Sequence, residues 1–117
     1  MQQFGDYIRG VRERLYEGDK SFSLRQVAVR VGIEPAYLSK IERGVFPPPS
    51  EKAIVKLAAA LGEDKDMLLA IAGKLSSDLQ RIILKRPKLF AALLRQLRGA
   101  PDHAILHVVR EVKDGKW

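Results

Sequence analysis

The chain has 117 residues and a formal net charge of +7. This length allows one domain, or a small domain with an appendage. The chain contains no cysteine, which excludes a disulfide framework, a zinc finger and a thiol nucleophile. The positive charge favours an anionic partner such as nucleic acid. Most of the basic excess lies late in the chain, because residues 74–117 hold 10 Lys/Arg against 4 Asp/Glu, whereas residues 1–73 hold 11 against 10.

The beginning of the sequence does not have the pattern of a secretory signal. Met1 is followed by no basic segment and no long apolar run, and the most apolar stretch, 58–61, is far shorter than a membrane span. We therefore expect a cytoplasmic protein without a membrane partner. The sequence also has no Gly-rich phosphate loop, no nucleophile elbow and no distinctive pair of carboxylates. We expect no enzymatic activity and no cofactor.

Apolar residues recur at helical spacing through the first part of the chain. A stripe over 4–15 predicts a first helix, which Gly18 interrupts. A second helix is predicted over Leu24–Val31, with Ser23 as its N-cap. A third helix is predicted over Pro35–Arg43, because proline fits the first turn of a helix, where its missing N–H has no helical partner.

A proline-rich connector separates these helices from the next ones. Residues 47–49 are all proline, which stiffens the chain and removes backbone donors. Helical spacing then predicts helices over 51–61 and 64–72. We therefore predict an all-α protein with a five-helix domain over 1–73 and a helical extension over 74–117.

The extension is predicted to hold two or three helices. Ser76 or Ser77 can cap a sixth helix, and Pro87 forces a break before a seventh. Residues 102–112 are compatible with a helix by their apolar spacing and with a strand by their β-branched content. The sequence leaves these two structures open for the last segment.

The second and third helices are joined by a short turn that contains Gly32, and such a pair can place one helix in the major groove of DNA. The run Ser23–Gly44, SLRQVAVRVGIEPAYLSKIERG, resembles the lambda-repressor/Cro-like helix-turn-helix of the XRE family. The part YLSKIERG is the most recognisable, and the prolines and the helix that ends in Leu61 and Gly62 extend the resemblance over residues 4–73. The resemblance implies a lambda-repressor-like DNA-binding domain in a transcriptional regulator, a repressor that reads a palindromic double-stranded operator through its third helix.

The resemblance also assigns DNA contacts by position. Residues that open the second helix would meet phosphate, and exposed residues of the third helix would face bases and phosphates. These residues are Ser23, Arg25, Gln26, Glu34, Ala36, Tyr37, Ser39, Lys40 and Arg43. Lys40 is the best candidate for a base contact, to guanine O6 or N7, whereas Tyr37 and Arg43 are expected at phosphate or sugar. Glu34 is compatible with a favourable position at the helix dipole and with cytosine readout.

Two features depart from the family pattern. The connection from Leu15 to Ser23 is longer than usual, and it either lengthens the first helix or forms a loop near the DNA. Pro35 and Ala36 stand where many members carry polar base-reading residues. This side of the third helix can therefore offer only apolar contacts, for example to a thymine methyl group.

Other charged residues have more general interpretations. Glu42 resembles the internal partner of a first-helix arginine in this family, here Arg12, which predicts a scaffold pair. A basic cluster in the extension either contacts phosphate or keeps a helix end soluble, and it consists of Arg81, Lys85, Arg86 and Lys88. Residues His103, His107 and Glu111 share one helical face, but the third lies too far along the axis to join the same metal ion. We expect no metal site.

Apolar faces in the extension predict association. The seventh helix has a broad face of Leu89, Phe90, Leu93, Leu94 and Leu97, and the last segment has a stripe of Ile105, Val109 and Val112. One reading helix contacts too few base pairs to select a genomic site, so we expect a homodimer built by residues after Lys74. Two alternatives are open: the seventh helix folds back on the first five, or the extension binds a protein partner, such as a co-regulator or the toxin of a toxin–antitoxin pair.

Overall fold

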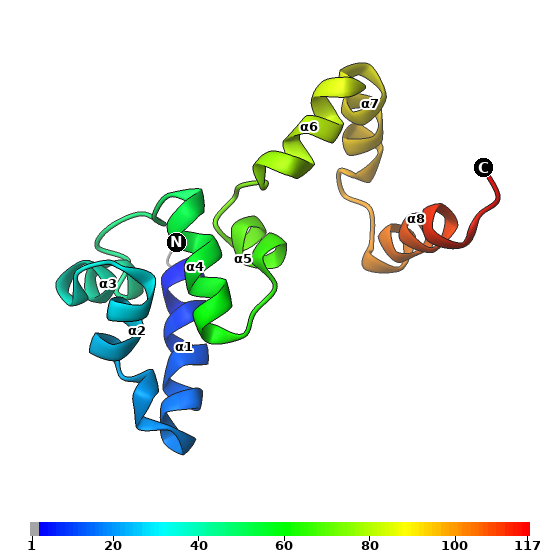
Figure 1. Cartoon of the computed structure of the whole chain (residues 1–117). Helices are drawn as coiled ribbons and strands as arrows, with labels where there is room; N and C mark the ends of the chain where they lie inside the picture. The colour runs from blue at the N-terminus through cyan, green and yellow to red at the C-terminus, as the bar shows by residue number, and fades with distance from the viewer. Residues whose placement is uncertain (1–2) are drawn as a thin grey trace. The chain divides into compact units, whose positions relative to one another are not determined.

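The computed structural model describes residues 3–117, and every regular element in that range is a helix (Figure 1). The elements are α1 (Gln3–Gly18), the short 3₁₀-helix η1 (Lys20–Phe22), α2 (Leu24–Val31), α3 (Pro35–Glu42), α4 (Glu51–Leu61), α5 (Lys65–Ile71), α6 (Ser77–Lys85), α7 (Pro87–Leu97) and α8 (Asp102–Asp114). The predicted all-α fold is confirmed, with five α-helices followed by further helices. The chain divides into two compact units, one that ends at Ser77 and one that runs from Asp78 to Trp117.

Local chemistry determines where the helices of the first unit begin and end. The Ser23 hydroxyl caps α2 by accepting a hydrogen bond from the backbone N–H of Gln26 at 3.2 Å. Gly32 ends the same helix with a φ of 83°, a conformation that residues with a Cβ rarely adopt. The structure of α4 repeats this arrangement between Ser50 and Gly62. Both sets of caps follow the sequence predictions.

The core of the first unit is formed by the apolar stripes of α1 to α5. The buried apolar residues are Phe4, Ile8, Val11, Val27, Ala28, Val31, Leu38, Ile41, Ile54, Leu57, Ala58, Leu61, Leu68 and Leu69. Gly5 lets α1 approach α3 closely, because a Cβ atom at this position would lie 2.3 Å from the carbonyl oxygen of Ile41 and 2.8 Å from that of Glu42. This contact between two backbones positions α3 against the scaffold.

The residues that follow α5 also belong to the first unit. The Lys74 ammonium donates a hydrogen bond to the carbonyl oxygen of Pro49 at 2.9 Å. Ser77 donates from its hydroxyl to the Glu51 carboxylate at 3.0 Å, and Ser76 is buried. These contacts explain why the division falls after Ser77, a few residues beyond the boundary that the sequence suggested.

The second unit contains amphipathic helices but no core. None of residues 78–117, all of which the structure describes, is buried. Pro87 occupies the first turn of α7, and the last segment forms the helix α8, which decides between the helix and the strand that its sequence allowed. Within this unit the exposed large apolar residues are Ile82, Leu84, Leu89, Leu93, Leu94, Ile105, Leu106, Val109, Val112 and Trp117.

Candidate nucleic-acid interface

The residues predicted to contact DNA all lie in the first unit, at the start of α2 and along α3. Ser23 uses its hydroxyl oxygen to cap α2, which leaves its proton free to donate to a ligand. Arg25 and Gln26 are exposed in the first turn of that helix. The first turn contains no acidic residue, and its outward backbone N–H groups carry the positive end of the helix dipole. This end of α2 therefore favours an anion such as phosphate.

The predicted contact residues of α3 differ in exposure. The exposed ones are Glu34, Ala36 and Arg43, and the half-buried ones are Tyr37, Ser39 and Lys40. Glu34 occupies the N-cap position without a side-chain cap hydrogen bond, so its carboxylate is not used by the helix backbone. The Arg43 guanidinium donates from Nε to the Ser39 hydroxyl at 3.3 Å, which links two predicted contact residues one turn apart.

The turn after α3 brings an aromatic residue back onto this helix. Gly44 has a φ of 73°, and the backbone N–H groups of Val45 and Phe46 both donate to the carbonyl oxygen of Lys40, at 2.9 and 3.2 Å. The Phe46 ring then lies 5.9 Å from the Tyr37 ring, measured between centroids, and the Lys40 ammonium lies 5.0 Å from the Phe46 centroid. The sequence predictions omitted Phe46, although an aromatic residue two positions after Gly44, at the end of the third helix, was a usable signal.

A buried ion pair connects α1 to the end of α3, as predicted. Arg12 donates to the Glu42 carboxylate from Nε at 2.7 Å and from Nη2 at 2.9 Å, a bidentate arrangement. Arg12 also donates to the carbonyl oxygen of Phe22 at 3.3 Å, and the hydrogen bonds to Glu42 raise the pKa of the Arg12 guanidinium above its ordinary value. The exposed fractions of Arg12 and Glu42 are only 8% and 3%, so the pair belongs to the scaffold.

A small hollow of about 130 Å³ lies beside this pair. Ser39 and Arg43 of α3 line it together with Arg9 of α1, which the sequence predictions did not include. The Arg9 guanidinium forms an exposed ion pair with Glu13 at 3.3 Å. The hollow therefore gathers cationic and hydroxyl groups from two helices next to the predicted contact residues.

The long connection after the first helix is divided between two elements. It lengthens α1 to Gly18, and its remaining residues form η1. Asp19 caps η1 by accepting the backbone N–H of Ser21 at 2.9 Å, and this hydrogen bond lowers the pKa of the Asp19 carboxyl. The Lys20 ammonium lies 4.0 Å from the centroid of the Tyr16 ring. The inserted residues are thus ordered by local contacts.

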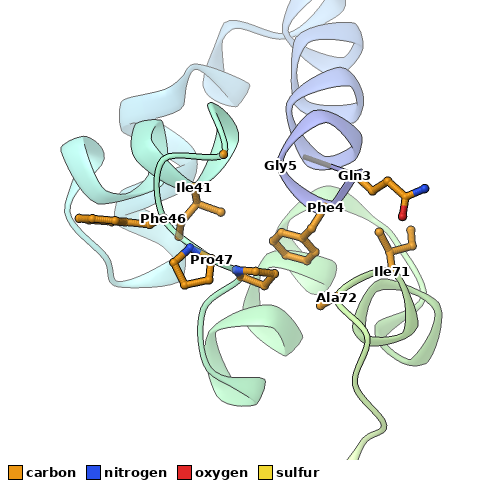
Figure 2. Close-up of a pocket in the computed structure, with 10 residues that line it drawn as sticks. Gln3, Phe4, Gly5, Ile41, Phe46, Pro47, Ile71 and Ala72 are labelled. Atoms are coloured by element: carbon orange, nitrogen blue, oxygen red, sulfur yellow. The ribbon is translucent and has the colours of Figure 1, made fainter. Parts of the chain in front are cut away.

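A second hollow, of about 310 Å³, lies between the start of α1, the connector after α3 and the end of α5 (Figure 2). Figure 2 shows Phe4 and Ile71 on one side of it and Ile41 and Pro47 on the other, whereas the Phe46 ring extends away from Phe4. No ionisable side chain and none of the predicted DNA-contact residues lines this hollow. Phe46, which contacts Tyr37 and Lys40, also lines this hollow, so the hollow borders the candidate interface at this residue.

A family model described as a helix-turn-helix domain matches residues 3–71, the segment that contains α1 to α5. The chain belongs to this helix-turn-helix family. Its relatives include the HTH-type transcriptional regulator SlrR of Bacillus subtilis, with 48% identity over 48 residues that cover 41% of this chain and 32% of SlrR. The HTH-type transcriptional regulator SinR of the same organism is 30% identical over 80 residues, which cover 63% of this chain and 72% of SinR.

A third relative, the uncharacterized HTH-type transcriptional regulator RghRB of Bacillus subtilis, is 35% identical over 77 residues, 66% of this chain and 52% of RghRB. The matched part of the present chain thus spans about a third of the length of SlrR and about half of the length of RghRB. No solved structure matches it significantly. Among residues 3–117, no helix is both long and apolar enough to cross a membrane, and no group of three or more His, Cys, Asp or Glu residues is placed to hold a metal ion.

Proposed function

We propose that this chain is a DNA-binding transcriptional regulator that reads a double-stranded operator through α3. The observation that carries the proposal is the α2–α3 pair, in which the buried Arg12–Glu42 contact ties α3 to α1 and the first turn of each helix contains no acidic residue. A major groove about 12 Å wide admits one α-helix. Membership of the helix-turn-helix family and three relatives named transcriptional regulators support the same function.

In this proposal the two helices have different tasks. Arg25 and Gln26 bind phosphate at the positive end of α2, and these contacts position the domain on the duplex. Lys40 donates to a guanine edge, and Arg43 contacts phosphate or sugar. Ala36, which is exposed at the start of α3, offers an apolar contact to a thymine methyl group.

We further propose that the protein acts as a homodimer through the second unit. The exposed apolar residues of α7 and α8 form faces that residues 78–117 themselves leave uncovered. A second copy can cover them with an identical face related by two-fold symmetry. Such a dimer would place two reading helices at half-sites about 34–36 Å apart and would read a palindrome. Repression is the mode that the resemblance to lambda repressor and Cro implies.

Binding-site selection with the purified full chain tests this function. A palindromic consensus with half-sites one helical turn apart is expected. Lys40→Ala should lower affinity for the selected site by about 1–3 kcal/mol and relax the preference at one base position, because it removes a base contact. Arg25→Ala should weaken binding to all sequences more evenly, because it removes a phosphate contact. Selection without any enriched sequence would refute the proposal.

The oligomeric state distinguishes the homodimer from an antitoxin. Sedimentation should give a dimer at micromolar concentration, and purification from native cells should give no other protein in stoichiometric amount. A monomer that co-purifies with one small protein would instead identify the extension as the toxin-binding element of a toxin–antitoxin pair.

A further inference from the structure

We propose that Phe46 is a positioning residue for DNA reading, whose ring holds the Lys40 ammonium at the outer side of α3. This inference rests on the proposed reading role of Lys40. It adds a residue outside the helix-turn-helix itself, on the turn that follows α3. The proposed ligand is the edge of a guanine base. Lys40 contacts this base, and Phe46 acts only by positioning Lys40.

The turn fixes the Phe46 backbone relative to the residue that it positions. The backbone N–H groups of Val45 and Phe46 donate to the carbonyl oxygen of Lys40 itself, at 2.9 and 3.2 Å. Gly44 makes the reversal possible with its φ of 73°. The backbone of Phe46 is therefore tied directly to the carbonyl group of Lys40, so the position of the Phe46 residue is set relative to the end of α3.

Phe46 makes ring contacts with two side chains of α3, Tyr37 and Lys40. Tyr37 and Lys40 are one turn apart on α3, so their side chains are neighbours. The Phe46 ring contacts both, with a centroid distance of 5.9 Å and an interplanar angle of 54° to Tyr37, and with the Lys40 ammonium 5.0 Å from its centroid. Tyr37 is half-buried against the core, so it offers the Phe46 ring a contact that is itself supported by the first unit. Figure 2 shows the Phe46 ring extending away from Phe4, although Phe46 also lines the neighbouring hollow.

Burial of Phe46 alone does not account for this arrangement. The side chain is large and apolar, yet 40% of the residue is exposed. A lysine side chain has several rotatable bonds and loses much conformational freedom when it is held in one geometry. A cation over an aromatic face is attracted to it while its N–H donors can still point elsewhere. The ring therefore restricts Lys40 before DNA arrives, so less entropy is lost when the ammonium binds a base.

The test compares Phe46→Leu with Phe46→Tyr in the full chain. Leucine keeps an apolar contact with Tyr37 but has no π face, whereas tyrosine retains the ring and can direct its hydroxyl to solvent. Val45→Ala is the matched control, because Val45 is also exposed in this turn and its side chain has no ring. Discrimination is measured as the affinity for the selected site divided by the affinity for a site altered at the base that Lys40→Ala identifies.

Phe46→Leu should lower this discrimination about two- to five-fold, the size of an exposed cation–π contact. Phe46→Tyr and Val45→Ala should leave it unchanged, and all three variants should keep the wild-type affinity for non-specific DNA. In the double variant Lys40→Ala, Phe46→Leu, the second substitution should have no further effect, because both residues act through one contact. NMR of the free protein gives an independent readout: the methylene protons next to the Lys40 ammonium should show a ring-current shift that Phe46→Leu removes.

Three outcomes would overturn the proposal. If Phe46→Leu leaves the discrimination unchanged while Lys40→Ala lowers it strongly, Lys40 reads the base and Phe46 has no part in base recognition. Improved discrimination in Phe46→Leu would mean that the ring withholds Lys40 from DNA. If Lys40→Ala alters no base position while the wild type still selects a consensus, Lys40 is not the reader and Phe46 has nothing to position. The DNA-binding function itself would survive all three outcomes.

Discussion

Both units of this chain are built from amphipathic helices, but among the described residues only the first unit has a buried apolar core. Among residues 3–77, the first unit buries the apolar side chains of a core that draws on five α-helices. Residues 78–117, all described, bury none, although α7 and α8 carry apolar residues at helical spacing. Hydrophobic burial is the main force that stabilises a folded domain. The first unit therefore supplies its own stabilisation, whereas the second unit exposes the apolar faces on which the proposed homodimer rests.

The buried ion pair should give the largest difference between a buried contact and an exposed one. Glu42→Ala leaves the Arg12 guanidinium inside the first unit without its partner and should lower the free energy of unfolding by about 3–5 kcal/mol. Glu13→Ala is the control, because it breaks the exposed Arg9–Glu13 pair of the same helix and should cost about 0–1 kcal/mol. Chemical denaturation measures both. A Glu42→Ala variant that unfolds like wild type yet fails to bind DNA would instead place Glu42 at the interface.

The same leucine truncation in each unit tests the comparison directly. Leu38→Ala removes a fully buried side chain and should lower the free energy of unfolding of the first unit by about 2–5 kcal/mol. Leu94→Ala removes a side chain of a residue that is 56% exposed, and should change the free energy of unfolding of the second unit by less than about 0.5 kcal/mol. The measurement is denaturation monitored at low protein concentration, where the proposed dimer would be dissociated. Equal effects would show that the second unit is packed as tightly as the first.

Local rules predicted most of the helices, because the signals lie within a few residues of each other. Ser23 and Gly32 delimit α2 through a hydroxyl and a positive φ that need no distant partner. The Arg12–Glu42 pair spans distant residues, and it was predictable only through the family resemblance. Gly5 and Phe46 were not predicted to have a role. Their contacts depend on how closely α1 approaches α3 and on the path of the turn after α3, and neither is encoded in apolar spacing.

Gly5→Ala should have an intermediate effect. The added methyl group would meet the backbone oxygens of Ile41 and Glu42, which cannot rotate away as a side chain could. We expect α1 to shift from α3 and the free energy of unfolding to fall by about 1–3 kcal/mol, even though alanine is a better helix former. Gly10→Ala is the matched control, since a Cβ atom added there would lie 3.4 Å from the flexible end of the Arg14 side chain and would meet no backbone atom of another helix. It should be neutral or stabilising in thermal unfolding, and a loss as large as that of Gly5→Ala would argue against the close approach.

Deletion of residues 78–117 should have the smallest effect on the stability of the first unit. A chain that ends at Ser77 keeps every buried apolar residue, together with the contacts of Lys74 and Ser77 to the α4 region. It should therefore unfold with nearly the free energy of the first unit in the full chain, measured by denaturation below the dissociation constant of the dimer. Sedimentation should show a monomer for the shortened chain and a dimer for the full chain. Specific DNA affinity should fall steeply, because one reading helix is left to contact one half-site.

The full chain with Leu89→Asp and Leu93→Asp should reproduce the monomer without shortening the protein, since burying two carboxylates of α7 in a dimer would cost too much desolvation energy. If the shortened chain still dimerises, or if the full chain is monomeric at micromolar concentration, the second unit is not the dimerisation element.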